Sequence, residues 1–377
     1  MERVSVRSAT FIGFVFCLIV FCLPNAVGQT NGLSVELKSQ KFPFEPTEYH
    51  ISKVLDVREN KSSIGSAILP TSSSDVSIQT VSFSGKAEHV LEKFIRTNLR
   101  QRIELRPVTI SMKHLKISET AKGQGLINGS VELSLLFETG DQLPVKLLEY
   151  KGGSRYTRSL DQTSAIEPVL SSTVINAIKH FNTWINREAG TNEKLAKKLN
   201  LSFREPREIS TGDTVFYSSN KKLNWQDFKS DPDKNSRFAA EIFPFFSFEQ
   251  SSRVSDGIIH VNIIPKVYMV RSFSWVRDHA RTPYTLNHEQ RHFDIVKIAA
   301  ERFRKKIAGE DLTVDNYQGI LSVEYLQILR EMNAMQKEYD TETGHGTDAA
   351  NQEKWNRKID SEIRSFYTSD RISAQRL

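Results

Sequence analysis

The order of local patterns along the chain constrains its fold most strongly. Up to about residue 276 the sequence reads as strands mixed with a few helices, and it includes the alternating run GIIHVNIIPKVYMV at 257–270. From Pro283 to the end, apolar residues recur mostly at helical spacing instead. Strands followed by helices predict an α+β fold in which the later helices are segregated from a sheet.

The length of the chain predicts two domains. With 377 residues it is longer than one ordinary domain, and each half is large enough to bury its own core. Residues 29–187 mix strand and helix patterns and predict an N-terminal α+β domain, to which we assign no chemistry. The polar, charge-rich passage 188–213, interrupted by Pro206, predicts a linker. Residues 214–377 then form the second domain.

The beginning of the chain has the features of a targeting signal. Arg3 and Arg7 precede an apolar run over residues 11–23, and a proline and small residues follow it. This run is too short to span a bilayer comfortably, so we expect residues 1–28 to be a cleaved signal peptide. No second apolar run of spanning length follows. The expected location is therefore secreted or periplasmic, with no stable membrane insertion after cleavage.

Cysteine and charge narrow the possible chemistry. Both cysteines, Cys17 and Cys22, lie inside the predicted signal peptide, so the mature chain would form neither a disulfide nor a thiolate metal site. Any zinc would then be bound by histidine, aspartate or glutamate. The net charge is +6, but lysine and arginine are scattered among acidic residues rather than gathered in a tract. We therefore expect no nucleic-acid binding.

The segment TLNHEQRHFDIVKIA at 285–299 contains two histidines four residues apart. On an α-helix such positions share one face, so His288 and His292 can both offer a ring nitrogen to one ion. Catalytic zinc sites use three protein ligands and leave a fourth position for water. Glu289, beside the first histidine, can act as the general base, as in HExxH metallopeptidases. The pattern thus predicts a Zn²⁺ site.

The boundaries of the helix that carries this motif are also predicted. Thr282 is a capping residue, and Pro283 suits the first helical position. Gly309 is a plausible stop. The two histidines would therefore lie well inside one rigid helix.

The motif and its surroundings resemble a known family. HEQRHFDI is similar to the signature of domain of unknown function 922, a family described as predicted secreted zinc-dependent proteases related to the zincins. The resemblance extends upstream to KLNWQDF and SFSWVRDHARTPYTLNHEQ, and downstream to MQKEYDTETGHG and NQEKWNRKI, so it covers about residues 215–365. It implies a zincin-like domain, with a small sheet followed by the metal-binding helix and further helices.

The third metal ligand must come from elsewhere in the chain. In the block YDTETGHG, His345 is flanked by two glycines that mark a tight loop, and it is the preferred candidate. Asp340 is the alternative. Tyr339 could donate a hydrogen bond to a developing oxyanion, or it could be a buried structural residue.

These observations predict an exported zinc metallopeptidase that acts on peptide or protein substrates. The alternative is a non-catalytic cell-envelope binding module with a structural or vestigial metal site. A metal-dependent hydrolase of non-peptide amides would use the same ligands. The strand around residues 258–264 could bind an extended peptide along a free edge, or it could be fully paired inside a sheet. The sequence predicts no oligomeric state.

Overall fold

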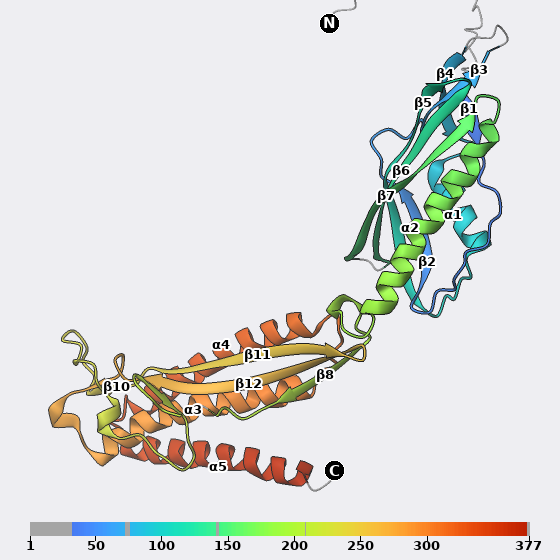
Figure 1. The fold of residues 1–377 in the computed structure, drawn as a ribbon. Coiled ribbons are helices and arrows are strands. Elements are labelled where there is room, and N and C mark those ends of the chain that lie inside the picture. The colour runs from blue at the N-terminus through green and yellow to red at the C-terminus, as the bar shows by residue number, and fades with distance from the viewer. Residues whose placement is uncertain (1–31, 72–75, 141–142, 208, 375–377) are drawn as a thin grey trace, which may run out of the picture.

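A computed structural model of the protein describes residues 32–71, 76–140, 143–207 and 209–374 (Figure 1). The predicted signal peptide, residues 1–28, lies outside this part of the chain together with both cysteines. No helix in the described ranges combines the length and the apolar character that crossing a bilayer requires. The fold is mixed α+β, as predicted, with two main sheets and a separate two-stranded ladder.

The first sheet has seven strands in mixed orientation. β2 runs parallel to β5, whereas β5, β6 and β7 form long antiparallel pairs. The path through the sheet is β1-β4-β3-β5-β6-β7, and β2 pairs with β5 off this path. The strands are β1 (Leu33–Val35), β2 (Tyr49–Asp56), β3 (Gly65–Pro70), β4 (Val76–Phe83), β5 (Arg106–Gly123), β6 (Leu126–Thr139) and β7 (Lys146–Ser159).

Two helices, α1 (Ala87–Asn98) and α2 (Ile166–Glu188), pack on this sheet and bury its core. The ring of Phe181 on α2 stacks on Phe137 of β6, with ring centroids 4.1 Å apart. The ring of Tyr49 on β2 contacts Phe181 edge-on, with ring centroids 4.9 Å apart. Aromatic contacts of this kind anchor α2 to the sheet.

The second sheet is built around β12 (Ile258–Val270). This strand pairs with β11 (Pro244–Ser255) along one side, and with β8 (Lys198–Phe203) and β9 (Thr214–Phe216) along the other. Because residues 258–263 are bonded on both sides, they form an interior strand and offer no free edge to a peptide. A separate two-stranded ladder joins β10 (Ala240–Glu241) to β13 (Trp275–Val276).

β8 lies inside the segment 188–213 that the sequence predicts to be a linker. Its alternating residues Leu199, Leu201 and Phe203 pack against the second core. The charged residues around this short run give it the composition of a linker, but the alternation is that of a half-buried strand. This part of the predicted linker therefore belongs to the second sheet.

Three long helices follow, α3 (Pro283–Ala308), α4 (Tyr317–Thr343) and α5 (Ala349–Ala374). The boundaries predicted for α3 are confirmed. The side chain of Thr282 accepts a hydrogen bond from the backbone N–H of Thr285, Pro283 follows the cap, and Gly309 ends the helix. In Figure 1 this helix runs beside β11 and β12.

α3 is buried on two faces. Phe303 packs against Phe246 and Phe248 of β11, with ring centroids 5.6 and 5.3 Å apart. Ile295 and Ile298 belong to a separate cluster with apolar and aromatic residues of α4 and α5. A helix held between a sheet and two other helices is a rigid support for the side chains that it carries.

Candidate metal centre

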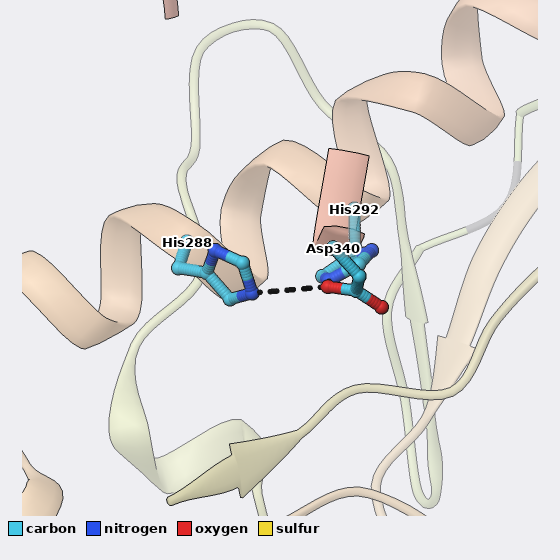
Figure 2. A group of neighbouring side chains, drawn as sticks. All are labelled: His288, His292 and Asp340. Atoms are coloured by element: carbon cyan, nitrogen blue, oxygen red, sulfur yellow. Dashed lines mark ion pairs between the residues drawn. The ribbon is translucent and has the colours of Figure 1, made fainter. Parts of the chain in front are cut away.

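His288, His292 and Asp340 come together at one point between α3 and α4 (Figure 2). Their candidate ligand atoms all lie within 4.8 Å of one another. Oδ1 of Asp340 is 3.3 Å from Nε2 of His288 and 3.0 Å from Nε2 of His292. The two histidines share a face of α3 because they are one turn apart, and Asp340 reaches them from the last turns of α4.

His345, the preferred third ligand from the sequence, lies outside this group. Its Nδ1 is 3.7 Å from Oδ1 of Asp340, and its ring packs on Phe238 with centroids 4.3 Å apart. It has a positive φ of 52° in the turn that ends α4, where its N–H donates to the backbone carbonyl of Asp340. His345 therefore borders the site, and the alternative, Asp340, completes the group of three.

Two glutamines that the sequence analysis missed contact the Nδ1 atoms of the two histidines. Oε1 of Gln352, on α5, is 2.9 Å from Nδ1 of His288. Oε1 of Gln336, on α4, contacts Nδ1 of His292. The signal for Gln336 was its place one turn before Asp340 on the same helix. Nothing local marks Gln352, because its role depends on how α5 packs.

Glu289 is buried beside the two histidines and lines the same cavity. Its Oε2 accepts a hydrogen bond of 2.9 Å from the backbone N–H of Ile242, just after β10. Burial raises the pKa of Glu289, while the neighbouring His292 and His288 act in the opposite direction. The result is a fixed carboxyl group with a raised pKa, which suits an exchangeable proton.

Tyr339, considered from the sequence as an oxyanion donor or as a buried structural residue, is outside the cavity lining. It is fully buried, and its ring stacks on His288 with centroids 4.8 Å apart. Its hydroxyl donates to the backbone carbonyl of His288 at 3.2 Å and accepts from Nε2 of Gln352 at 2.7 Å. The hydroxyl proton is thus already used in a bond to the backbone, which favours a structural role for Tyr339.

The three side chains open onto a cavity of about 450 Å³ between α3, α4 and β10. Among the described residues, its lining contains carboxylates and imidazoles but no lysine or arginine. Burial would raise the pKa of Asp340, but hydrogen bonds and charge from His288 and His292 hold it well below the usual range. The carboxylates and imidazoles of the lining are Glu241, Glu289, Asp340, His288, His292 and His345.

The donor set fits a divalent cation. Two imidazole nitrogens and one carboxylate oxygen face a common point, and each histidine has a hydrogen-bond partner on its other nitrogen. Such second contacts are typical of metal-ligating histidines. Imidazole and carboxylate donors suit several first-row divalent metals, Zn²⁺ among them. The described residues therefore form a possible metal site.

Comparison with known proteins supports the family resemblance. Residues 279–346 match the family model described as "Bacterial protein of unknown function (DUF922)". A comparison with curated proteins gives no match. Among solved structures, the chain is similar to the crystal structure of protein XCC0632 from Xanthomonas campestris, of family DUF330, at 13% identity and a TM-score of 0.26. That similarity covers 40% of this chain and 92% of the other. The matched residues 279–346 contain His288, His292 and Asp340.

Proposed function

We propose that this chain is an exported zinc-dependent metallopeptidase. In this proposal His288 and His292, through Nε2, and Asp340, through Oδ1, hold Zn²⁺. The observation that carries it is the convergence of these three donors on the wall of one cavity, with the buried carboxyl group of Glu289 beside them. The zincin-like character of residues 214–377 is part of the same proposal, supported by the motif helix that packs on a sheet.

The chemistry proposed for the chain's own residues is proton transfer by Glu289. When bound, the cation supplies Lewis-acid polarisation of a substrate carbonyl. Glu289 takes a proton from the attacking water and returns it to the leaving amine nitrogen. The N–H of Ile242 holds one carboxylate oxygen in place. The raised pKa of Glu289 supports this role, because a base with a pKa closer to the working pH exchanges its proton more readily.

The experiment that tests the function is Glu289→Gln in the metal-loaded mature chain. We expect hydrolysis of casein or of a peptide library to fall by about 10²-fold or more. The content of Zn²⁺ per chain should stay unchanged, because Glu289 is not one of the three donors. Glu301→Gln is the matched control on the same helix, since Glu301 pairs with Lys297 and does not line the cavity.

The alternatives are outcomes of the same experiment. A wild-type chain that binds one metal ion but hydrolyses no peptide would favour the non-catalytic binding module. Hydrolysis of small amides without hydrolysis of peptides would favour the non-peptide hydrolase. Export is a separate proposal that rests on residues 1–28, and N-terminal sequencing of the protein from a bacterial envelope or medium fraction would check their removal.

A further inference from the structure

Each of the two glutamines contacts one histidine ring in the same way, although they come from different helices. Gln336 on α4 is partly buried, and Gln352 on α5 is buried. Each places its side-chain oxygen against Nδ1 of one histidine, so that Nε2 of both rings faces the Asp340 side of the site.

The orientation of the Gln336 amide is fixed by a backbone carbonyl. Its Nε2 donates to the carbonyl oxygen of His292 at 3.1 Å. A carbonyl oxygen only accepts, so the NH₂ group must lie there and Oε1 must face the ring. His292 thus supplies both the ring nitrogen that Gln336 contacts and the backbone carbonyl that orients the Gln336 amide.

The orientation of the Gln352 amide is fixed by a relay of two bonds. The hydroxyl of Tyr339 donates its proton to the backbone carbonyl of His288, 3.2 Å away. Its oxygen must then accept from Gln352, whose Nε2 lies 2.7 Å away. Oε1 of Gln352 is left facing Nδ1 of His288. Each amide is therefore oriented by the backbone carbonyl of the histidine that it contacts, directly for Gln336 and through Tyr339 for Gln352.

From this geometry we propose that Gln336 and Gln352 are positioning residues that keep a proton on Nδ1 of His292 and His288, so that Nε2 of each ring is free for a cation. An amide oxygen accepts only, so Nδ1 must carry the hydrogen in both contacts. The inference rests on the proposed cation site. It assigns that site a supporting pair of uncharged amides, which orient the ligands without adding negative charge.

The same contacts link the site to α5. Gln352 is held in α5 one turn before Asn356, whose side-chain oxygen accepts from Gln352 and from Arg291 of α3. Binding of a cation should therefore stabilise the packing of α5 on α3, because the ligand binds only the arrangement in which His288 is held in place. We expect slower amide hydrogen exchange in α5 when Zn²⁺ is added.

The test measures the affinity of the mature chain for Zn²⁺ and Co²⁺ by competition with a chromophoric chelator. Gln336→Ala and Gln352→Ala should each lower the affinity by about 10- to 100-fold and alter the visible spectrum of bound Co²⁺. Gln336→Glu and Gln352→Glu keep an acceptor oxygen and should restore part of the loss. Lys337→Ala and Lys354→Ala, exposed neighbours on the same two helices, should bind as the wild type does.

Two results of the affinity assay would overturn the inference: alanine variants that are folded and bind with wild-type affinity, or glutamate variants that bind no better than alanine. If the wild type binds no cation, the proposed function fails, and a second measurement still tests the tautomers. In metal-free Asp340→Ala at alkaline pH, ¹H–¹⁵N spectra of the histidine rings should show protonated Nδ1 and unprotonated Nε2. Protonated Nε2 in that variant would refute the proposal.

Discussion

Oδ1 of Asp340 lies 3.0 Å from Nε2 of His292, so a carboxylate of α4 faces an imidazole of α3 across one wall of the cavity. The same oxygen is 3.3 Å from Nε2 of His288. One short side chain therefore connects the end of α4 to two successive turns of α3. This relationship makes Asp340, rather than a residue of the following turn, the third member of the candidate metal site.

The first prediction separates Asp340 from His345. Asp340→Ala should lower the Zn²⁺ content of purified protein from one ion per chain to well below one, because it removes a donor. His345→Ala should leave the content near one, because its ring packs on Phe238 outside the group of three donors. Metal analysis of the two variants beside the wild type measures this. A loss of Zn²⁺ from His345→Ala, with the content of Asp340→Ala near one, would instead assign the third ligand to His345.

The second prediction concerns Gly346, which lies against His288. A Cβ at this position would meet Cγ of His288 at 3.1 Å, and the backbone has a φ of +78°. Gly346→Ala should therefore cost about 1–2 kcal/mol of stability and also lower Zn²⁺ affinity by displacing the ring. Thermal unfolding and a chelator competition assay measure the two effects.

Gly125 provides the matched control for that substitution. Its φ is +72°, and a Cβ there would meet nothing within 4 Å. Gly125→Ala should show a similar loss of stability, because the backbone strain is alike, with unchanged Zn²⁺ affinity. Equal affinities in the two variants would mean that His288 tolerates the added methyl group.

The third prediction tests the supporting role of Tyr339. Tyr339→Phe removes two buried hydrogen bonds, the one that its hydroxyl donates to the His288 carbonyl and the one that it accepts from Gln352. We expect a loss of about 1–3 kcal/mol in the free energy of unfolding. At saturating Zn²⁺, kcat should change by less than about 10-fold, whereas removal of an oxyanion donor typically costs 10²- to 10³-fold. A fall of the larger size with unchanged stability would restore the oxyanion role.

The fourth prediction concerns acid stability and the first sheet. Glu119 of β5 and Arg158 of β7 form an ion pair of 2.7 Å, and both side chains are 0% exposed. Burial would raise the pKa of Glu119, but hydrogen bonds from Arg158, Ile68 and Tyr156 lower it below its usual value. The pKa of Glu119 is thus lower in the folded protein than in the unfolded chain, where it is near 4.3. The ion pair therefore stabilises the fold fully above about pH 4.3, and this stabilisation is lost as the pH falls through the folded pKa.

Glu119→Gln should therefore cost about 3–5 kcal/mol at pH 7, because it leaves Arg158 without its buried partner. The difference from wild type should shrink as the pH is lowered below about 4. Urea unfolding at several pH values measures both. Glu132→Gln, an exposed glutamate on the neighbouring strand β6, should change stability by less than about 0.5 kcal/mol at each pH. A cost that did not vary with pH would exclude this ion pair as a source of acid sensitivity.

The sequence predicts the features of the fold and the site that depend on local backbone geometry. α3 follows from a capping threonine, a proline and a terminal glycine, all within the helix or next to it. The common face of His288 and His292 follows from 3.6 residues per turn. The order of strands before helices likewise predicts the mixed fold, because each element needs one apolar face to pack. The division of the chain into two domains stays a prediction, although the buried residues around the two sheets form separate clusters.

The choice between Asp340 and His345 depends on tertiary structure. α4 continues through Asp340 to Thr343, which places the carboxylate on the face toward α3, one turn after Gln336. The left-handed backbone from Gly344 to Gly346 then turns the imidazole toward Phe238. The sequence shows the glycines but does not show in which direction the turn points. Gln352 was missed for a similar reason, since only the packing of α5 brings it to His288.

The place of Gln352 has a practical consequence for work with fragments. The family match ends at Gly346, six residues before this glutamine. A fragment trimmed to the match would retain all three candidate donors but lose one of the two amides, and with it the Trp355 indole that lies behind Tyr339. Its metal affinity would then understate that of the intact protein. Expression boundaries chosen for crystallisation or assay should therefore include the whole of α5.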